Sequence, residues 1–429
     1  MITLDRPLAR HLLADSAVIA ADGRLSVGGM DVVELADSFG TPLFVYDEAH
    51  LRNRCREAVA VFGTGVAYGS KAFGCLAMAE LAAAEGMVLD VATGGELHTA
   101  LAAGASPERI VLHGNNKSQA ELVQAADLGV KIVVDSFDEL DRLESIVAGR
   151  PVAAVPVMVR VTPGVEAHTH EFVRTGQVDS KFGFGLVCGD AALAVERVRS
   201  IRGLAFVGIH VHIGSQIFAL DSFAQTLEVM VDFVAATGAG ELCIGGGLGV
   251  AYLGSEAAPT ITQWAAAVHE ASEALGIEAR ITAEPGRSIV ATAGMTLYRV
   301  GTIKEVPGVR TYVSVDGGMS DNPRPVLYGS GYEAFLPRSA HAARPRSVTV
   351  VGKHCESGDL VVRDAQVPED LAVGDVLATP VTGAYGHSMA SNYNRVGRPP
   401  VVFVADGSPR LVVRRETNDD LLRLEESLR

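Results

Sequence analysis

The feature that most constrains the fold is a series of eight apolar, strand-like runs separated by stretches with helical spacing. The runs cover 66–72, 87–93, 109–115, 131–136, 156–162, 204–214, 241–249 and 280–287. Such runs are typical of parallel strands that helices cover on both faces. Eight of them alternating with helices predict an α/β fold of the (β/α)8 barrel type. An open doubly wound sheet would more often carry its glycine-rich loop after the first strand, whereas here it follows the seventh.

The two ends of the chain have a different pattern. Residues 1–46 contain turn signals and a strand entered through a Gly-Thr-Pro turn, which is too little to fold alone. After residue 290, strand runs return without long helices, at 296–306, 310–315, 346–351, 374–378, 401–404 and 410–414. An acidic helix is expected at 419–428. We therefore expect N-terminal strands in 1–46 that join a β domain, a barrel in 47–290, and a mostly β domain, sandwich- or barrel-like, in 291–429.

Composition limits the class of partner. The chain has 429 residues, 48% of them hydrophobic, and a net charge of −15, which argues against nucleic acid or an anionic membrane surface. The five cysteines are widely spaced without a Cys-x-x-Cys pair, so we expect neither a disulfide framework nor a metal site. The first residues do not resemble a signal peptide, and no run approaches the roughly 20 apolar residues of a membrane span. We expect a cytoplasmic protein.

Polar residues collect at the ends of the predicted barrel strands, where barrels place their active sites. The first run ends at Lys71, the second at Asp90, the third at His113, the sixth near His212 and the eighth at Glu284. A charged, unpaired amine at the end of a buried strand is costly. Two roles would explain Lys71 at this position. It can form an ion pair at the barrel mouth, or it can form a Schiff base with a carbonyl cofactor. That stretch alone favours the ion pair.

Two loops are suited to an anion. The glycine cluster at 245–249 follows the seventh run, and its backbone N–H groups can surround a phosphate, although a simple tight turn explains it equally well. Gly286 and Arg287 follow the eighth run. Many barrels bind phosphate in the loops after strands 7 and 8, which favours the anion interpretation.

Three further residues each allow two interpretations. Glu284 can pair with a nearby cation, or it can face the ring nitrogen of a pyridine cofactor and keep that nitrogen protonated. His212 can be a satisfied core histidine or can stack on a planar cofactor, and the sequence leaves these even. Cys355 lies between His354 and Glu356. Most free cysteines are inert, but charged neighbours support a reactive or proton-donating role at least as well.

In their order along the chain, these motifs resemble those of the pyridoxal 5′-phosphate (PLP)-dependent decarboxylases of the alanine racemase-like fold, and most closely the diaminopimelate decarboxylase family. The resemblance extends from about residue 40 to about residue 424. It rests on Tyr-Gly-Ser-Lys-Ala-Phe at 68–73, Leu-His-Gly-Asn-Asn-Lys at 112–117, Glu-Ala-His-Thr-His-Glu at 166–171, Lys-Phe-Gly at 181–183, His-Val-His-Ile-Gly-Ser-Gln at 210–216, Gly-Gly-Gly at 245–247, Glu-Pro-Gly-Arg at 284–287, Cys-Glu-Ser-Gly-Asp at 355–359 and Gly-Ala-Tyr at 383–385.

The resemblance implies roles for the matched residues. Lys71 would anchor PLP through a Schiff base, His212 would stack on the ring, and Cys355 would act beside the substrate α-carbon, so these three are the expected catalytic residues. The expected cofactor-binding residues are Lys71, Asp90, His212, Ser215, Gly246, Gly247, Glu284, Gly286, Arg287 and Tyr385. The expected substrate-binding residues are Arg287, Arg324, Tyr328, Glu356 and Tyr385.

The resemblance also implies a reaction and an assembly. The reaction is decarboxylation of meso-2,6-diaminopimelate to L-lysine, the last step of lysine biosynthesis. The assembly is a homodimer with active sites at the interface, into which the Cys355-Glu356 stretch reaches. After loss of CO2, either Cys355 or Lys71 can deliver the final proton.

The residues expected at the far end of the substrate bear on specificity. Arg324 offers a fork for a distal carboxylate and Glu356 a partner for a distal ammonium, which favours diaminopimelate over ornithine or arginine. The ornithine enzymes show Asp at the position of Glu356. Gly386-His387 departs from what relatives often carry after Tyr385, so the fit of the substrate there stays open. The alternatives are a decarboxylase of another basic or modified amino acid, an amino-acid racemase, and a non-catalytic regulator on this fold.

Overall fold

The computed structural model describes residues 8–149, 154–165 and 179–428. The predicted Glu-Ala-His-Thr-His-Glu motif at 166–171 lies outside the described residues. The chain divides into two compact units. Unit 1 comprises Met1–Asn53, Val250–Ala257 and Ile289–Arg429, and unit 2 comprises Arg54–Gly249 and Ala258–Ser288. The three-segment division expected from the sequence stays a prediction.

Unit 2 is built on eight parallel strands in a single sheet, with a short ninth strand beside them. The eight are β5 (Ala67–Gly69), β6 (Val88–Val91), β7 (Ile110–Leu112), β8 (Lys131–Val134), β9 (Val155–Thr162), β11 (Leu204–Val211), β12 (Glu241–Cys243) and β13 (Arg280–Thr282), and β10 (Phe184–Gly185) pairs with β9. The last strand meets the first, because the amides of Ala67 and Gly69 donate to the carbonyls of Ala283 and Pro285 at 2.9 and 3.1 Å. The predicted (β/α)8 barrel is therefore confirmed.

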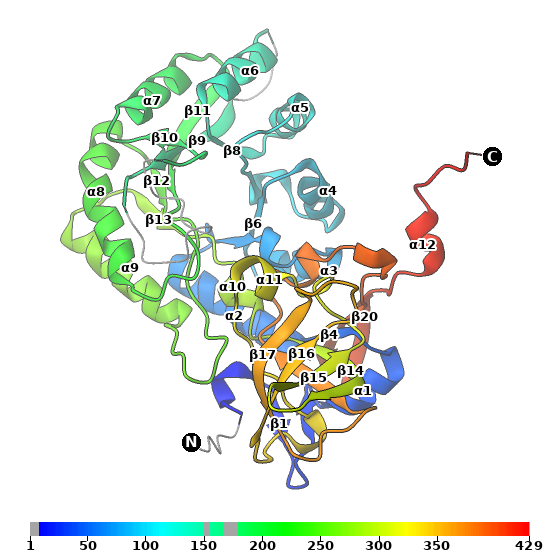
Figure 1. Ribbon diagram of the computed structural model, residues 1–429. Coiled ribbons are helices and arrows are strands. Elements are labelled where there is room, and N and C mark those ends of the chain that lie inside the picture. Colours follow the sequence, from blue (N-terminus) through cyan, green and yellow to red (C-terminus); the bar gives the residue numbers. More distant parts are fainter. Residues whose placement is uncertain (1–7, 150–153, 166–178, 429) are drawn as a thin grey trace. The chain divides into compact units, whose positions relative to one another are not determined.

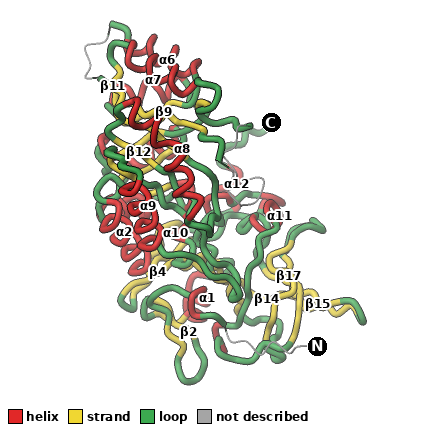
Figure 2. Tube along the Cα trace, turned by 90° about the vertical axis from the view of Figure 1, so that its left-hand side faces the viewer, coloured by secondary structure: helices red, strands yellow, loops and turns green. Residues whose placement is uncertain are grey.

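Helices alternate with the barrel strands, with α2 before the first strand, and lie outside them (Figure 1). They are α2 (Glu48–Phe62), α3 (Leu76–Ala84), α4 (Gly94–Ala102), α5 (Gln119–Leu128), α6 (Phe137–Val147), α7 (Asp190–Ser200), α8 (Asp221–Thr237), α9 (Ile261–Ala274) and the short α10 (Arg287–Val290). The capping box expected at Ser118 and Glu121 is present at the start of α5. Helices α8 and α9 lie side by side (Figure 2), and the rings of Phe223 and Trp264 between them are 5.2 Å apart.

An apolar layer fills the barrel interior below the strand ends. It takes one side chain from each of six strands, Ala67, Val88, Val111, Val133, Met158 and Cys243, and Val207 of β11 packs against it. Barrels of this size are filled by such layers and hold no open pore. Polar side chains above the layer, at the carboxyl ends of the strands, are therefore close together on a rigid base.

Unit 1 is mostly β structure. Its larger sheet runs in the order β17 (Leu360–Val367), β16 (Arg346–Val351), β15 (Arg310–Val315), β14 (Gly294–Val306), β4 (Leu43–Asp47), β19 (Val401–Ala405) and β20 (Ser408–Val413), with β18 (Val376–Pro380) also paired to β14. Every residue of β4 is buried between β14 and β19. The prediction that an N-terminal strand joins the C-terminal β domain is therefore confirmed.

Three expectations for unit 1 were wrong. The N-terminal segment holds a small sheet, β1 (Val18–Ile19), β2 (Leu25–Val27) and β3 (Met30–Asp31), but also a helix, α1 (Val32–Phe39), which the Asp31 carboxylate caps through two backbone amides. Strand β17 was missed, because exposed Arg363 and Asp364 interrupt its apolar pattern. The closing helix α12 (Asn418–Leu422) stops before residue 428, since Leu424 and Leu428 are exposed and have no apolar surface to cover.

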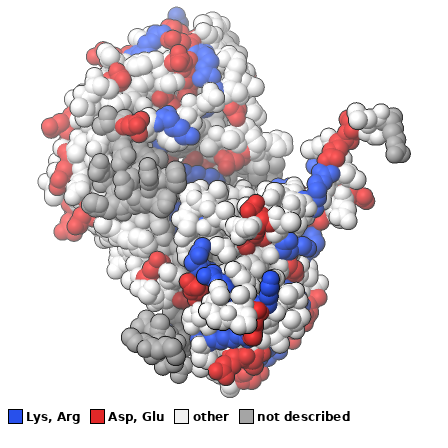
Figure 3. Space-filling view, in the orientation of Figure 1, with Lys and Arg blue, Asp and Glu red and all other residues white. Residues whose placement is uncertain are grey.

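Two surface properties complete the description. Among the described residues, none of the helices combines the length and the apolar character that a bilayer crossing requires. Acidic and basic side chains both occur across the face drawn in Figure 3.

A buried lysine fixes the loop between β7 and α5. The Lys117 Nζ donates to the carbonyl oxygens of Gly114 and Val133 at 2.8 and 2.6 Å, and to Glu139 Oε1 at 2.8 Å. Both side chains of this ion pair are almost fully buried. The pair joins the loop that carries His113 to strand β8 and helix α6. Removal of one partner from such a pair leaves an uncompensated charge inside the protein.

We predict that Lys117→Met lowers the free energy of unfolding of unit 2 by about 3–5 kcal/mol, because Glu139 loses its buried partner. Trp264 is the only tryptophan of the chain and is buried in unit 2, so its fluorescence during urea unfolding reports on this unit. The matched control is Arg197→Met, which removes an exposed ion pair with Glu144 and should leave the midpoint almost unchanged. Equal effects of the two variants would contradict the prediction.

Candidate active site

The carboxyl ends of the barrel strands bring together ionisable side chains that are distant in sequence. Lys71 lies in a single turn directly after β5, Asp90 is in β6, His113 follows β7, His210 is in β11 and Glu284 follows β13. Gly286 allows the turn with Lys71 to approach the end of β13, because a Cβ at this glycine would lie 2.8 Å from the Gly69 carbonyl oxygen. The predicted strand-end residues of unit 2 therefore line one end of the barrel.

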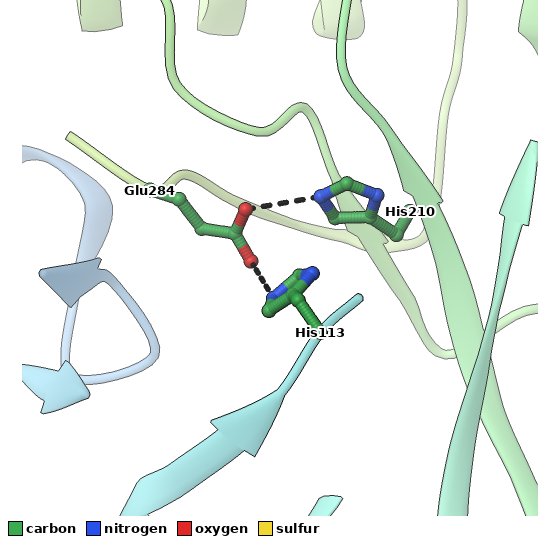
Figure 4. Close-up of side chains that lie close together, drawn as sticks. All are labelled: His113, His210 and Glu284. Atoms are coloured by element: carbon green, nitrogen blue, oxygen red, sulfur yellow. Dashed lines mark hydrogen bonds and ion pairs between the residues drawn. The ribbon is translucent and has the colours of Figure 1, made fainter. Parts of the chain in front are cut away.

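Glu284 lies between two histidines (Figure 4). Its Oε1 is 2.9 Å from His113 Nε2 and its Oε2 is 3.0 Å from His210 Nε2. The side chain exposes only 9% of its surface, and this burial alone would raise its pKa. The ion pair with His113 and the hydrogen bond with His210 outweigh burial and hold the pKa of Glu284 well below its ordinary value. Glu284 is an ionised carboxylate in a largely buried position.

The two histidines differ in protonation. Burial lowers the pKa of His210 to about 4, with further lowering by the positive charges of His113 and Arg160. Burial acts on His113 too, but Glu284 and Asp90 outweigh it and raise the pKa of His113. Asp90 Oδ1 is 3.6 Å from His113 Nε2. Beside Glu284 the pKa values of the two imidazoles are therefore shifted in opposite directions, upward for His113 and downward for His210.

His113, His210 and Glu284 also form the group among the described residues whose ligand atoms could surround a metal ion, since these atoms lie within 4.8 Å of one another. A metal ion needs both imidazoles as neutral ligands. The raised pKa of His113 and the positive charge of nearby Arg160 oppose such binding. The arrangement favours an ion-paired carboxylate over a metal centre.

His212 faces the glycine loop. Its Nδ1 accepts a hydrogen bond from the Gly246 amide at 3.2 Å. Burial, followed by the positive charge of Lys71, holds the pKa of His212 well below its ordinary value. His212 is therefore a neutral ring of fixed tautomer close to Lys71. A Cβ at Gly246 would overlap the carbonyl oxygen of Glu284, so only glycine fits there.

A hydrogen bond joins one of the two predicted anion loops, at Gly286-Arg287, to the loop after β11. Arg287 Nη2 donates to Ser215 Oγ at 2.9 Å, across the loops after β11 and β13. Gly247 belongs to the glycine loop between them, where a Cβ would overlap the Gly214 carbonyl oxygen. Together these loops offer a guanidinium, a hydroxyl and glycine amides at one edge of the barrel mouth, which are the donors that a phosphate needs.

The remaining predicted residues belong to unit 1. Arg324 begins α11 (Arg324–Tyr328), a short helix that ends at the partly buried Tyr328. The Arg324 guanidinium lies over the Tyr252 ring at 4.3 Å and donates through Nη1 to the Tyr332 hydroxyl at 2.8 Å. Tyr385 adopts a left-handed backbone with φ 58°, which non-glycine residues rarely adopt outside functional or tightly constrained positions.

Cys355 and Glu356 are exposed on the loop between β16 and β17. The base of this loop is held by Asp359, whose carboxylate accepts from the amides of Met319 and His354 at 2.6 and 2.9 Å. The segments at 316–322 and 353–359 therefore pack against each other. This contact holds the base of the loop that carries Cys355 and Glu356.

Sequence reasoning assigned no role to His113, His210, Tyr252 or Tyr332. The two histidines stand at strand ends in the sequence, and that position is the signal that could have found them. The two tyrosines carry no such signal, because only the folded unit 1 brings both to Arg324.

A barrel with a lysine, an ionised carboxylate and an anion-suited loop at its strand ends has the parts that a pyridoxal phosphate enzyme requires. A family model described as "Pyridoxal-dependent decarboxylase, pyridoxal binding domain" matches residues 48–291, more than half of the chain. The diaminopimelate decarboxylase of Mycobacterium tuberculosis is 48% identical over 425 residues, which cover 94% of this chain and 95% of that protein. The Bacillus subtilis diaminopimelate decarboxylase is 45% identical over 424 residues, with the same coverage.

Solved structures agree with these relatives. The crystal structure of diaminopimelate decarboxylase from M. jannaschii in complex with L-lysine matches with a TM-score of 0.88 and 32% sequence identity, over 96% of this chain and 98% of that chain. The chain therefore belongs to the pyridoxal-dependent decarboxylases and, within them, to the diaminopimelate decarboxylase family.

The side chains present fit the cofactor of this family. PLP carries an aldehyde, a ring nitrogen that works best when protonated, a flat ring and a phosphate. An amine, an ionised carboxylate, a neutral imidazole and a cluster of anion-binding donors are the matching groups. Lys71, Glu284, His212 and the loops around Gly246 and Arg287 supply them in unit 2.

We predict that Gly246→Ala weakens binding of PLP about tenfold or more, because the new methyl group must displace the loop that carries Glu284. Titration of the cofactor-free chain with PLP, followed by absorbance, measures this change. The matched control is Gly95→Ala, whose Cβ would lie 3.8 Å from its nearest neighbour, an ordinary contact. Unchanged affinity in Gly246→Ala would be evidence against this loop as part of the cofactor site.

Proposed function

We propose that this chain decarboxylates meso-2,6-diaminopimelate to L-lysine and CO2, the last step of lysine biosynthesis, with PLP as its cofactor. The observation that carries the proposal is the ionised Glu284 at the mouth of the barrel that also carries Lys71. The choice of substrate is supported by the relatives with 45–48% identity, which are named diaminopimelate decarboxylases.

The residues of unit 2 supply the cofactor chemistry in this proposal. Bound PLP acts as an electron sink for the pair of electrons that CO2 leaves behind. Lys71 holds the cofactor covalently, Glu284 keeps its ring nitrogen protonated, and neutral His212 covers the ring. Asp90, whose pKa burial raises to about 6, stays mainly ionised near pH 7 and faces His113. Ser215, Gly246, Gly247, Gly286 and Arg287 receive the phosphate.

The residues of unit 1 supply specificity. Arg324 is held against Tyr252 and by Tyr332, so its fork has a fixed orientation, and a fixed fork suits a planar carboxylate. Glu356 is an exposed carboxylate that suits an ammonium. Diaminopimelate carries both groups at its distal end, whereas ornithine and arginine carry only the cation. Tyr328 and Tyr385 complete the proposed substrate contacts, together with Arg287 of unit 2.

Cys355 is the proposed proton donor to the substrate α-carbon, with Lys71 as the other candidate. The Cys355-Glu356 loop is exposed, and we propose that it serves the barrel of a second copy in a homodimer whose active sites lie at the interface. A cytoplasmic location accords with the five cysteines, all of which are described and none of which forms a disulfide.

The alternatives make different demands on the same residues. An ornithine- or arginine-type decarboxylase needs no fork for a distal carboxylate, and Arg324 disfavours it. A racemase needs a second acid/base opposite Lys71 and does not need the Cys355-Glu356 pair. A non-catalytic regulator needs neither Lys71 nor Cys355, and both are present.

We predict CO2 release from meso-diaminopimelate with kcat/KM roughly 100-fold or more above the values for ornithine, arginine and lysine, because only diaminopimelate pairs with both Arg324 and Glu356. The assay supplies each amino acid separately to the PLP-loaded protein. Lys71→Ala is the control and should release no CO2 from any of them. Release from ornithine but not from diaminopimelate would overturn the assigned specificity.

We predict that two inactive variants, Lys71→Ala and Cys355→Ala, restore activity when combined in one dimer. If each site takes Lys71 from one protomer and Cys355 from its partner, a mixed dimer keeps one intact site and roughly half of the wild-type activity. Coexpression with two affinity tags isolates the mixed dimer, and dimers of each single variant are the controls. No recovery in a verified mixed dimer would argue against a shared site.

A further inference from the structure

The two histidines that flank Glu284 have no role in the function proposed above, and their surroundings differ. His113 lies between two carboxylates, with its Nε2 2.9 Å from Glu284 and 3.6 Å from Asp90. His210 Nε2 is 3.0 Å from Glu284 Oε2. The two rings meet edge to face, with centroids 4.9 Å apart and planes at 65°. Each ring therefore limits the movement of the other, and both limit Glu284.

The backbone holds both rings from separate elements. His210 is within β11, which pairs with β9 on one side and β12 on the other. His113 directly precedes the loop that Lys117 ties to β8 and α6 through its bonds to Val133 and Glu139. His210 is therefore held within the sheet, and His113 is held next to a loop that a buried ion pair ties to β8 and α6.

The charges around the cluster explain why the histidines differ. The positive or neutral groups near the cluster are Lys71, Arg160 and His212. The negative groups are Glu284, Asp90 and the more distant Glu96. Arg160 opposes protonation of both His113 and His210. Glu284, followed by Asp90, favours a charged His113, whereas among the described residues only Glu284 is found to favour a charged His210.

We propose that His113 and His210 are unequal positioning residues for Glu284, with His113 as its cationic partner and His210 as a neutral N–H donor. The proposal rests on the proposed function, since it assumes that Glu284 serves the ring nitrogen of PLP. A carboxylate buried without such partners takes up a proton and can no longer keep that nitrogen protonated. His113 supplies the charge that keeps Glu284 ionised, and His210 fixes its second oxygen.

Glutamine variants separate the two roles, because the glutamine amide can replace a neutral Nε2–H donor but not a charge. We expect His210→Gln to keep kcat within about threefold of wild type, and His113→Gln to lower it about tenfold or more with little change in KM, since loss of one partner of a buried ion pair costs more than exchange of one neutral donor for another. His98→Gln, on the exposed face of α4, is the matched control and should change neither constant. Equal losses in His113→Gln and His210→Gln would overturn the assignment of unequal roles.

NMR of the full chain labelled in the histidine rings gives a readout that needs no activity. The single variants assign the His113 and His210 signals. We expect His113 to stay protonated above pH 6.5 and His210 to stay neutral down to about pH 4, and Glu284→Gln to lower the pKa of His113. Reversed protonation of the two rings, or the same pKa in both, would refute the proposal.

A zinc titration tests the competing arrangement. With cofactor-free protein, we expect an equimolar amount of Zn2+ to leave the His113 and His210 signals in place. Tight zinc binding that both His113→Gln and His210→Gln abolish would show a metal site instead. If the wild-type protein released no CO2 from any amino acid, the proposed function would fail while the NMR titration still decided the protonation of the two rings.

Discussion

The ionised state of Glu284 is the constraint on which the candidate active site depends. A carboxylate with 9% of its surface exposed needs compensation, and two histidines from different strand ends provide it. The cluster in turn requires the barrel to be closed, because Glu284 follows the last strand while His113 and His210 belong to the third and sixth. The hydrogen bonds from β5 to the segment after β13 bring Lys71 to the same place. The contact between β5 and the segment after β13 therefore both closes the barrel and assembles the candidate site.

Unit 1 has a separate physical problem, which is to hold a buried arginine. Arg324 is 5% exposed, and its guanidinium is held against two tyrosine rings and hydrogen-bonded to the hydroxyl of Tyr332. Rings accept a guanidinium without neutralising it, so the charge stays available for an anion. A carboxylate partner would have neutralised the charge of the guanidinium. This choice of partner agrees with the proposed role of Arg324 in binding a distal carboxylate.

Much of the fold could be predicted from the sequence, because each barrel strand is an apolar run bounded by clear breaks and ends in polar residues. Helix α1 was missed, since it is only eight residues long and begins with Val32 and Val33, two β-branched residues that favour a strand. The residue types of the site could also be predicted from the strand ends. The opposite pKa shifts of His113 and His210 could not, because they depend on burial and on contacts with Glu284 and Asp90 that only the folded barrel creates. Tyr252 was missed because only the folded unit 1 brings it to Arg324.

The measurement that tests the central claim most directly is the location of the covalent cofactor link. The chain has only six lysines, and Lys117 and Lys131 are already in ion pairs with Glu139 and Glu241. Borohydride reduction of the PLP-loaded protein, followed by proteolysis and mass spectrometry, identifies the modified lysine. The account predicts a stoichiometric pyridoxyl group on Lys71. A stoichiometric pyridoxyl group on any other lysine, or none at all, would contradict it.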